Sequence, residues 1–134
     1  MDFEIIEHTG DVGIRYFGST VIELFSSALK GTAYVIGVPS PGCSRSSTQL
    51  ELQFTDYPDL MMQLIDHIIY SFEVEEILYD SITQFTFEDN SAKIGLEGCR
   101  IDANFQYRYI LKAPTYHKME INLEKGYGIQ IFDI

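Results

Sequence analysis

Hydrophobic residues recur at helical spacing after Thr20, which marks the start of the first predicted helix. Thr20 and Glu23 fit a capping box, in which the Thr20 hydroxyl accepts a hydrogen bond from the Glu23 amide while the Glu23 carboxylate reaches back. Gly37 and Pro39 are predicted to end the helix. Its apolar face is formed by Val21, Leu24, Phe25, Ala28, Leu29 and Thr32.

A second stretch with the same spacing covers Asp56–Phe72. Asp56 is predicted to cap this helix, and Pro58 fits its first turn, where a missing amide proton costs no intrahelical hydrogen bond. Each of the two helices therefore has one apolar face to bury. The face of the second helix is formed by Leu60, Met61, Leu64, Ile65, Ile68 and Phe72.

Most of the remaining chain alternates between apolar and polar residues, as half-buried β-strands do. Glu124-Lys125-Gly126 predicts a tight hairpin turn, and the Pro-, Gly- and Ser-rich segment 39–47 predicts a mobile loop. We predict a single α+β domain over residues 1–134, a two-layer fold with both helices packed on one face of a largely antiparallel β-sheet. Strands are predicted at 3–7, 14–17, 50–54, 77–87, 93–97, 105–111, 119–123 and 127–132.

The chain has a strong acidic excess, with 20 Asp and Glu against 9 Lys and Arg and a formal charge of −11. Nucleic-acid binding depends on neutralising phosphates with Lys and Arg, so stable direct binding of RNA or DNA is not expected. A cation or a basic protein surface is the better-matched partner.

The N-terminus begins Met1-Asp2-Phe3-Glu4 and lacks the apolar segment of a signal peptide, and no apolar run approaches the length of a membrane span. We therefore expect a cytoplasmic protein. Cys43 and Cys99 lie far apart and belong to no CxxC motif. Two free thiols are the expectation for such a pair in the cytoplasm.

Acidic residues lie near both chain ends. Asp11 lies between two glycines in the sequence GDVG, which allows a sharp bend that presents the carboxylate. At the other end a strand-like pattern continues to Asp133 and Ile134, so the terminal groups are expected to be held in place. If the two ends meet, three anionic groups converge and repel one another unless a cation binds. Oxygen ligands favour Ca²⁺, with Mg²⁺ and Mn²⁺ as alternatives. The plainer alternatives are a turn aspartate and an ordinary chain end.

His8 and His117 are candidates to support this metal site, since His8 lies three residues before Asp11. Neither HxH nor HExxH occurs, so zinc is not favoured, and hydrogen-bonded structural histidines are the alternative. His67 is expected to be structural or exposed on the second helix. The motifs GxSxG, GxGxxG and GxxxxGK[ST] are absent, so no catalytic residue and no bound nucleotide cofactor are assigned.

Three segments together resemble the archease family. Glu7–Ile14 is similar to its EHTADIGI signature, Lys112–Ile121 to its K-A-x-T-Y-H-x-x-E-I stretch, and Phe132-Asp133-Ile134 to its C-terminal FDI. Their order and positions make the combination specific, and the likeness extends along the whole chain. Pro114 departs from the pattern and removes one strand donor, so pairing is expected to be interrupted just before Thr115.

The resemblance implies an accessory protein of the RtcB-type RNA ligase of tRNA splicing, which joins a 2′,3′-cyclic-phosphate or 3′-phosphate RNA end to a 5′-hydroxyl end. It implies that this chain promotes guanylylation of the ligase and multiple turnover but is not itself an enzyme. The metal-binding acids of the family correspond to Asp11 and Asp133, with Ile134 contributing through its main chain or terminal carboxylate.

Two alternatives to this function remain open. One is a small metal-dependent phosphoester hydrolase that uses Asp11, Asp133 and His117. The other is a chaperone-like interaction module. Whatever the function, a monomer or a weak homo-oligomer is expected, since exposed aromatic residues on the sheet could pair between copies.

Overall fold

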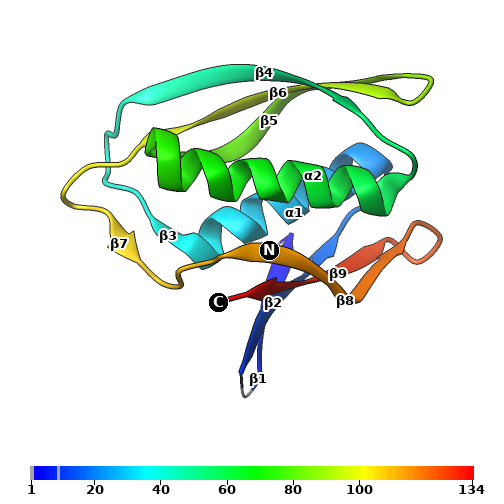
Figure 1. The fold of residues 1–134 in the computed structure, drawn as a ribbon, viewed down its shortest axis with the longest axis horizontal. Helices are drawn as coiled ribbons and strands as arrows, with labels where there is room; N and C mark the ends of the chain where they lie inside the picture. Colours follow the sequence, from blue (N-terminus) through cyan, green and yellow to red (C-terminus); the bar gives the residue numbers. More distant parts are fainter. Residues whose placement is uncertain (1, 9) are drawn as a thin grey trace.

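The computed structural model describes residues 2–8 and 10–134, with the side chain of His8 outside the description. Within these residues the chain forms two α-helices, one π-helical segment and nine strands, which confirms the predicted α+β class (Figure 1). The elements are β1 (Phe3–His8), β2 (Asp11–Phe17), α1 (Val21–Ile36), β3 (Gly37–Val38), β4 (Arg45–Gln53), α2 (Tyr57–Tyr70), η1 (Ser71–Glu75), β5 (Ile77–Glu88), β6 (Ser91–Arg100), β7 (Gln106–Tyr107), β8 (Ala113–Asn122) and β9 (Tyr127–Asp133).

The strands are antiparallel, as predicted, but they divide between two larger sheets and one short pair instead of forming the single predicted sheet. The larger sheets have the orders β1-β2-β9-β8 and β4-β6-β5, and β3 pairs with β7. Both helices lie between the two larger sheets, with β4-β6-β5 above and β1-β2-β9-β8 below (Figure 1). α1 contacts β2 and β5, whereas α2 contacts β8 and β4. The helices therefore bury apolar side chains against both sheets.

Local sequence signals set both helix starts. The Thr20 hydroxyl accepts from the Glu23 amide at 3.1 Å, as the capping box predicts. The Glu23 carboxylate reaches one residue further back than Thr20 and accepts from the amide and hydroxyl of Ser19 at 3.0 and 2.8 Å. Asp56 caps α2 by accepting from the Asp59 amide at 2.9 Å. These bonds satisfy amides that have no partner within the helix.

One continuous hydrophobic core joins the helices to both large sheets. Phe25 of α1 makes an edge contact with Phe85 of β5, with ring centroids 5.3 Å apart. The fully buried side chains include Ile14, Tyr16, Phe25, Leu29, Leu64, Ile68, Ile94 and Phe132. Among the helices described, none combines the length and hydropathy that a bilayer span requires.

The predicted strand at 105–111 is wrong over most of its length. Only Gln106 and Tyr107 pair, and they pair with β3. The next two amides bond to carbonyls at the end of α1, because Arg108 N donates to Ile36 O at 2.9 Å and Tyr109 N donates to Val35 O at 3.2 Å. The alternating pattern reflects burial of its end residues, and the helix C-terminus supplies the partners that a strand would otherwise supply.

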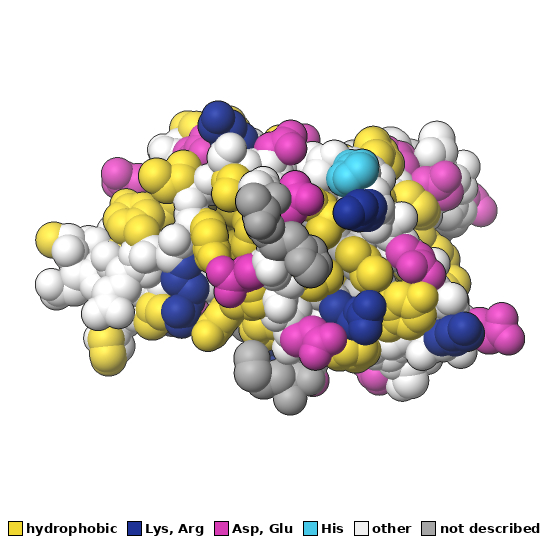
Figure 2. All heavy atoms as spheres, turned by 90° about the horizontal axis from the view of Figure 1, so that it is seen from below, with side chains coloured by type: hydrophobic (Ala, Val, Ile, Leu, Met, Phe, Trp, Pro, Cys, Tyr) yellow, Lys and Arg dark blue, Asp and Glu magenta, His cyan; other side chains and the backbone are white. Residues whose placement is uncertain are grey.

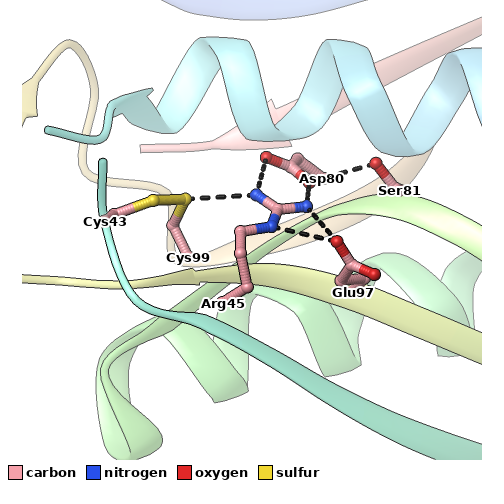
Figure 3. A network of polar contacts seen from close by, with 6 residues as sticks. All are labelled: Cys43, Arg45, Asp80, Ser81, Glu97 and Cys99. Atoms are coloured by element: carbon pink, nitrogen blue, oxygen red, sulfur yellow. Dashed lines mark hydrogen bonds and ion pairs between the residues drawn. A yellow bond between two sulfur atoms is a disulfide. The ribbon is translucent and has the colours of Figure 1, made fainter. Parts of the chain in front are cut away.

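The expectation of two free thiols is also wrong, because Cys43 and Cys99 form a disulfide with a Cα–Cα distance of 5.6 Å (Figure 3). The disulfide links the segment predicted as a mobile loop, residues 39–47, to β6. The end of that segment is not a loop, because β4 begins at Arg45. Beside the disulfide, the Arg45 guanidinium forms ion pairs with Asp80 and Glu97, each at 3.0 Å. The cysteines lie 56 residues apart in sequence, so only the pairing of β4 with β6 brings them together.

Candidate metal site at the ends of β2 and β9

The strand register brings the beginning of β2 beside the end of β9. Val12 pairs with Phe132 in the antiparallel ladder. One step further along, Asp11 is the first residue of β2 and Asp133 the last of β9, so the two aspartates occupy facing positions at the end of the ladder. A cation site between these acidic positions requires the two chain ends to meet, and the fold places their strands side by side.

Side-chain alternation directs both aspartates away from the helices. Val12 and Phe132 are buried on the helix side, with 1% and 2% of their surface exposed. Successive strand residues point to opposite faces, so Asp11 and Asp133 point to the outer face of the sheet. Asp133 is exposed and Asp11 is partly exposed. Both carboxylates are therefore open to solvent and to a partner.

Two glycines shape the chain around Asp11. Gly10 has a φ of 84°, in the left-handed region that glycine adopts most readily. A Cβ atom at Gly13 would lie 2.5 Å from the Gln130 carbonyl oxygen, so a side chain there would push β2 and β9 apart. The glycines on either side of Asp11 thus allow the tight turn before it and the close strand approach after it.

The backbone of Asp133 is fixed from the other side by the segment that precedes β8. Lys112 N donates to Asp133 O at 2.8 Å, and Ala113 pairs with Asp133 in the ladder. Ile134 follows directly and is exposed. Its main-chain oxygens therefore lie one residue from an anchored backbone.

Glu7 and Tyr109 form a second polar contact near Asp11, which the sequence analysis missed. The Tyr109 hydroxyl donates to the Glu7 carboxylate, and this bond raises the pKa of Tyr109. Glu7 belongs to β1, whereas Tyr109 lies in the irregular segment before β8. No local pattern links residues so far apart in sequence, and their contact depends on the fold.

A groove of about 520 Å³ runs along the outer face of the β1-β2-β9-β8 sheet from Asp11. Its floor includes Ile129 and Ile131, and Arg15 and Lys118 lie along it. Arg15 also forms a 3.9 Å ion pair with Glu4. Figure 2 views the molecule from this side and shows hydrophobic side chains interspersed with acidic and basic ones. The outer face is thus a mixed surface beside the aspartates.

A wide bulge in β8 carries the Tyr-His-Lys part of the second motif. Thr115 pairs with Ile131 and Glu120 pairs with Ile129, so the four residues between Thr115 and Glu120 face the single residue Gln130 of β9. The expected interruption at Pro114 therefore falls after Thr115 rather than before it, since Pro114 itself pairs with Phe132. The side-chain amide of the buried Gln130 donates to the Thr115 carbonyl oxygen at 2.9 Å and so fixes the bulge at its Thr115 end.

The histidines differ in their surroundings. His117 is exposed in this bulge, and its amide donates to the Thr115 hydroxyl at 3.0 Å. His67 is half-buried, with its ring 6.5 Å from those of Tyr70 and Tyr79, in line with the structural role expected for it. The side chain of His8 lies outside the described part of the chain. Among the residues described, no three His, Cys, Asp or Glu side chains form a potential metal group.

The candidate ligands are all oxygen atoms. Two carboxylates from adjacent strands and the main-chain oxygens of Ile134 suit a hard cation such as Ca²⁺ or Mg²⁺ better than zinc, which prefers Cys and His. Ca²⁺ takes about six to eight oxygen ligands, more than these residues provide. The residues therefore fit a cation whose remaining positions are filled by water or by groups from a partner.

Comparison with known proteins agrees with this fold and with the order of the motifs. The Archease protein family (MTH1598/TM1083) matches residues 3–134. The chain is 28% identical over 134 residues to the protein archease of Thermoplasma volcanium, with 100% of both chains covered. It is 31% identical over 133 residues to that of Saccharolobus islandicus, covering 95% of this chain and 94% of the relative. The chain belongs to the archease family.

Two solved structures have the same fold. The solution structure of Methanobacterium thermoautotrophicum protein 1598 superposes with a TM-score of 0.75 at 21% identity, covering 99% of each chain. The crystal structure of an archease from Thermotoga maritima, described as a possible chaperone, gives a TM-score of 0.65 at 19% identity, with 98% of this chain and 96% of the other covered.

Proposed function

We propose that this protein is a non-enzymatic activator of an RtcB-type RNA ligase and acts in the cytoplasm. In this proposal it promotes guanylylation of the ligase and supports multiple turnover in tRNA splicing or RNA repair. The proposal extends family membership to a particular partner and reaction.

One observation carries the proposal, namely the facing positions of Asp11 and Asp133 at an open end of the sheet. The two carboxylates and Ile134 would hold a divalent cation, of which Ca²⁺ is favoured. A bound divalent cation would neutralise phosphate charge in the transfer of a guanylyl group. In this role the chain would bind and orient the cation with an incomplete set of oxygen ligands, and the partner would supply the remaining ligands.

The charge of the chain supports the same type of partner. Its formal charge of −11 favours encounter with a basic surface, and a protein that binds RNA ends presents such a surface. Electrostatic attraction of this type raises the association rate more than the final affinity. Binding of the two proteins is therefore expected to weaken as salt concentration rises.

The test is a guanylylation assay of the purified cognate ligase with GTP and a series of divalent ions, with and without this protein. We expect the wild type to increase both the guanylylated fraction and the number of turnovers. Asp11→Asn and Asp133→Asn should lose this stimulation. Asp66→Asn serves as the matched control, because Asp66 is an exposed residue of α2 and belongs to neither β2 nor β9. Full stimulation by Asp133→Asn would refute the proposal.

A chaperone-like role is the second candidate. It is favoured by large hydrophobic side chains on the surface, among them Ile110 at 73% and Tyr107 at 63% exposure. The Thermotoga maritima relative is described as a possible chaperone. Suppression of the aggregation of an unrelated unfolded protein, without any ligase, would support this role over the first.

A further inference from the structure

A second concave site lies on the surface where the end of α1, η1 and the segment after β7 meet. This site, the η1 pocket, has a volume of about 260 Å³. Ile36 and Ile69 form its floor and are almost fully buried, with 1% and 3% of their surface exposed. Phe72 and Ile110 line its sides. The pocket is thus apolar inside and large enough for one long side chain.

Aromatic packing fixes one wall of the η1 pocket before any partner binds. Tyr107 lines the pocket and makes edge contacts with Phe72 and Phe105, with ring centroids 5.9 and 4.9 Å apart. Phe72 and Phe105 also contact each other at 5.2 Å. A pre-formed apolar wall lowers the entropy cost of binding, because few side chains must be ordered.

Two carboxylates complete the lining of the η1 pocket. Glu73 and Glu76 are both exposed and line the same concave site. The carbonyl of Glu76 accepts from the Ile101 amide at 2.8 Å, which fixes the backbone at that point. Among the ion pairs between described residues, none uses Glu73 or Glu76. The two carboxylates are therefore available to a cationic group from outside.

We propose that the η1 pocket receives a lysine or arginine side chain of a protein partner. Such a side chain packs its aliphatic stem against Ile36 and Ile110 while its charged head meets Glu73 and Glu76. A purely aliphatic side chain would leave the carboxylates without a cation, and an acidic one would be repelled. Arginine is one of the residue types that most often contribute a large share of the affinity of protein interfaces.

The η1 pocket lies close along the chain to the candidate metal site. Leu111 lines the pocket, and the next residue, Lys112, donates to the carbonyl of Asp133. One partner surface could therefore contact both sites. This inference rests on the function proposed above in naming the partner, which is the RNA ligase.

The first test measures binding of the cognate ligase by calorimetry and pairs each pocket variant with a control elsewhere. Ile110→Lys and Glu73→Lys each place a cation where the basic side chain of the partner would bind, so each should weaken binding by about tenfold or more, equivalent to about 1.4 kcal/mol. Leu123→Lys and Glu124→Lys make the same changes at exposed positions in the β8–β9 turn and should bind as the wild type does. Unchanged thermal melting of all four variants would show that each is folded.

The second test needs no ligase. Amide NMR spectra are recorded while an N-acetyl, C-amide Leu-Arg-Leu peptide is added, and the titration is repeated with a Leu-Glu-Leu peptide. The arginine peptide alone should shift the signals of Glu73, Glu76 and Ile110, and Glu73→Lys should abolish these shifts. Absence of shifts, or equal shifts with both peptides, would overturn the pocket inference.

The two tests separate the pocket from the proposed function. If the wild type stimulates the ligase and Ile110→Lys binds it normally, the pocket inference fails and the proposed function stands. If the wild type neither binds nor stimulates the ligase, the proposed function fails, and the peptide titration decides the side-chain preference of the pocket.

Discussion

The backbone amide of Lys112 donates a 2.8 Å hydrogen bond to the carbonyl oxygen of Asp133. This bond extends the β8–β9 pairing by one residue beyond Ala113, the first residue of β8, and holds Asp133, the last residue of β9. Asp133 consequently presents its exposed carboxylate from an ordered backbone. Because the fixing contact uses main-chain atoms, the side chain can be changed without removing what holds the strand end.

The first prediction concerns Asp133→Asn and the sign of its effect on stability. Like charges at facing positions of an antiparallel pair destabilise a sheet, by about 0.2–1 kcal/mol. In the presence of a chelator the variant should therefore unfold at the same temperature as the wild type or higher. With Ca²⁺ the order should reverse, because only the wild type keeps both carboxylates and gains stability from binding. Thermal melting with a chelator and with a Ca²⁺ series measures both effects.

Asp66→Asn is the control for this prediction, since it removes one carboxylate from an exposed helix position. It should keep the Ca²⁺-dependent rise in melting temperature. An equal rise in the wild type and in Asp133→Asn would show that Ca²⁺ binds elsewhere.

The second prediction concerns the Cys43–Cys99 disulfide. Closing a loop between cysteines 56 residues apart restricts the unfolded chain, and removal of such a bond typically costs about 2–5 kcal/mol. Reduction of the wild type and Cys43→Ser should lower the free energy of unfolding by the same amount. Urea unfolding with and without reductant measures the difference. A reductant effect that persists in Cys43→Ser would contradict the assignment.

The elements that the sequence predicted well depend on neighbours in the chain. Thr20 and Asp56 each cap the helix that starts directly after them, so neighbouring residues in the sequence are enough to predict their role. The segment 105–111 was misassigned because its amides bond to carbonyls of α1, about 70 residues earlier, a partner that alternation cannot reveal. The disulfide was missed for the same reason.

The candidate site shows the same division between local and distant signals. Asp11 and Asp133 were singled out from their local sequence, and the β2–β9 register places their strands together. The Glu7–Tyr109 contact was not predicted, and the interruption expected just before Thr115 lies after it, in the bulge opposite Gln130. The contact depends on the approach of two distant segments, and the position of the bulge depends on the register between β8 and β9. A single segment encodes neither.

The third prediction concerns His67 and the pH dependence of stability. Burial lowers the pKa of His67 below its ordinary value of 6.5, although the charge of Glu75 opposes this effect. Between the folded and unfolded pKa values the unfolded chain binds more protons, so stability rises with pH in this window and is lost as the pH falls below about 6.5. His67→Gln should reduce this slope. Urea unfolding between pH 5.5 and 7.5 measures it, and equal slopes in both proteins would contradict the prediction.

The fourth prediction concerns the hydroxyl of Tyr16. The side chain is buried in the core, burial raises its pKa, and its hydroxyl has no hydrogen-bond partner among the described residues. A buried polar group without a partner costs about 1–3 kcal/mol, so Tyr16→Phe should raise the free energy of unfolding by about 1 kcal/mol. Tyr127→Phe is the control, because the Tyr127 hydroxyl donates to Glu120 at 2.5 Å and its removal should bring no gain. Chemical denaturation of the three proteins gives the comparison. A loss of stability in Tyr16→Phe would show that the hydroxyl is satisfied in solution, for example by a buried water molecule.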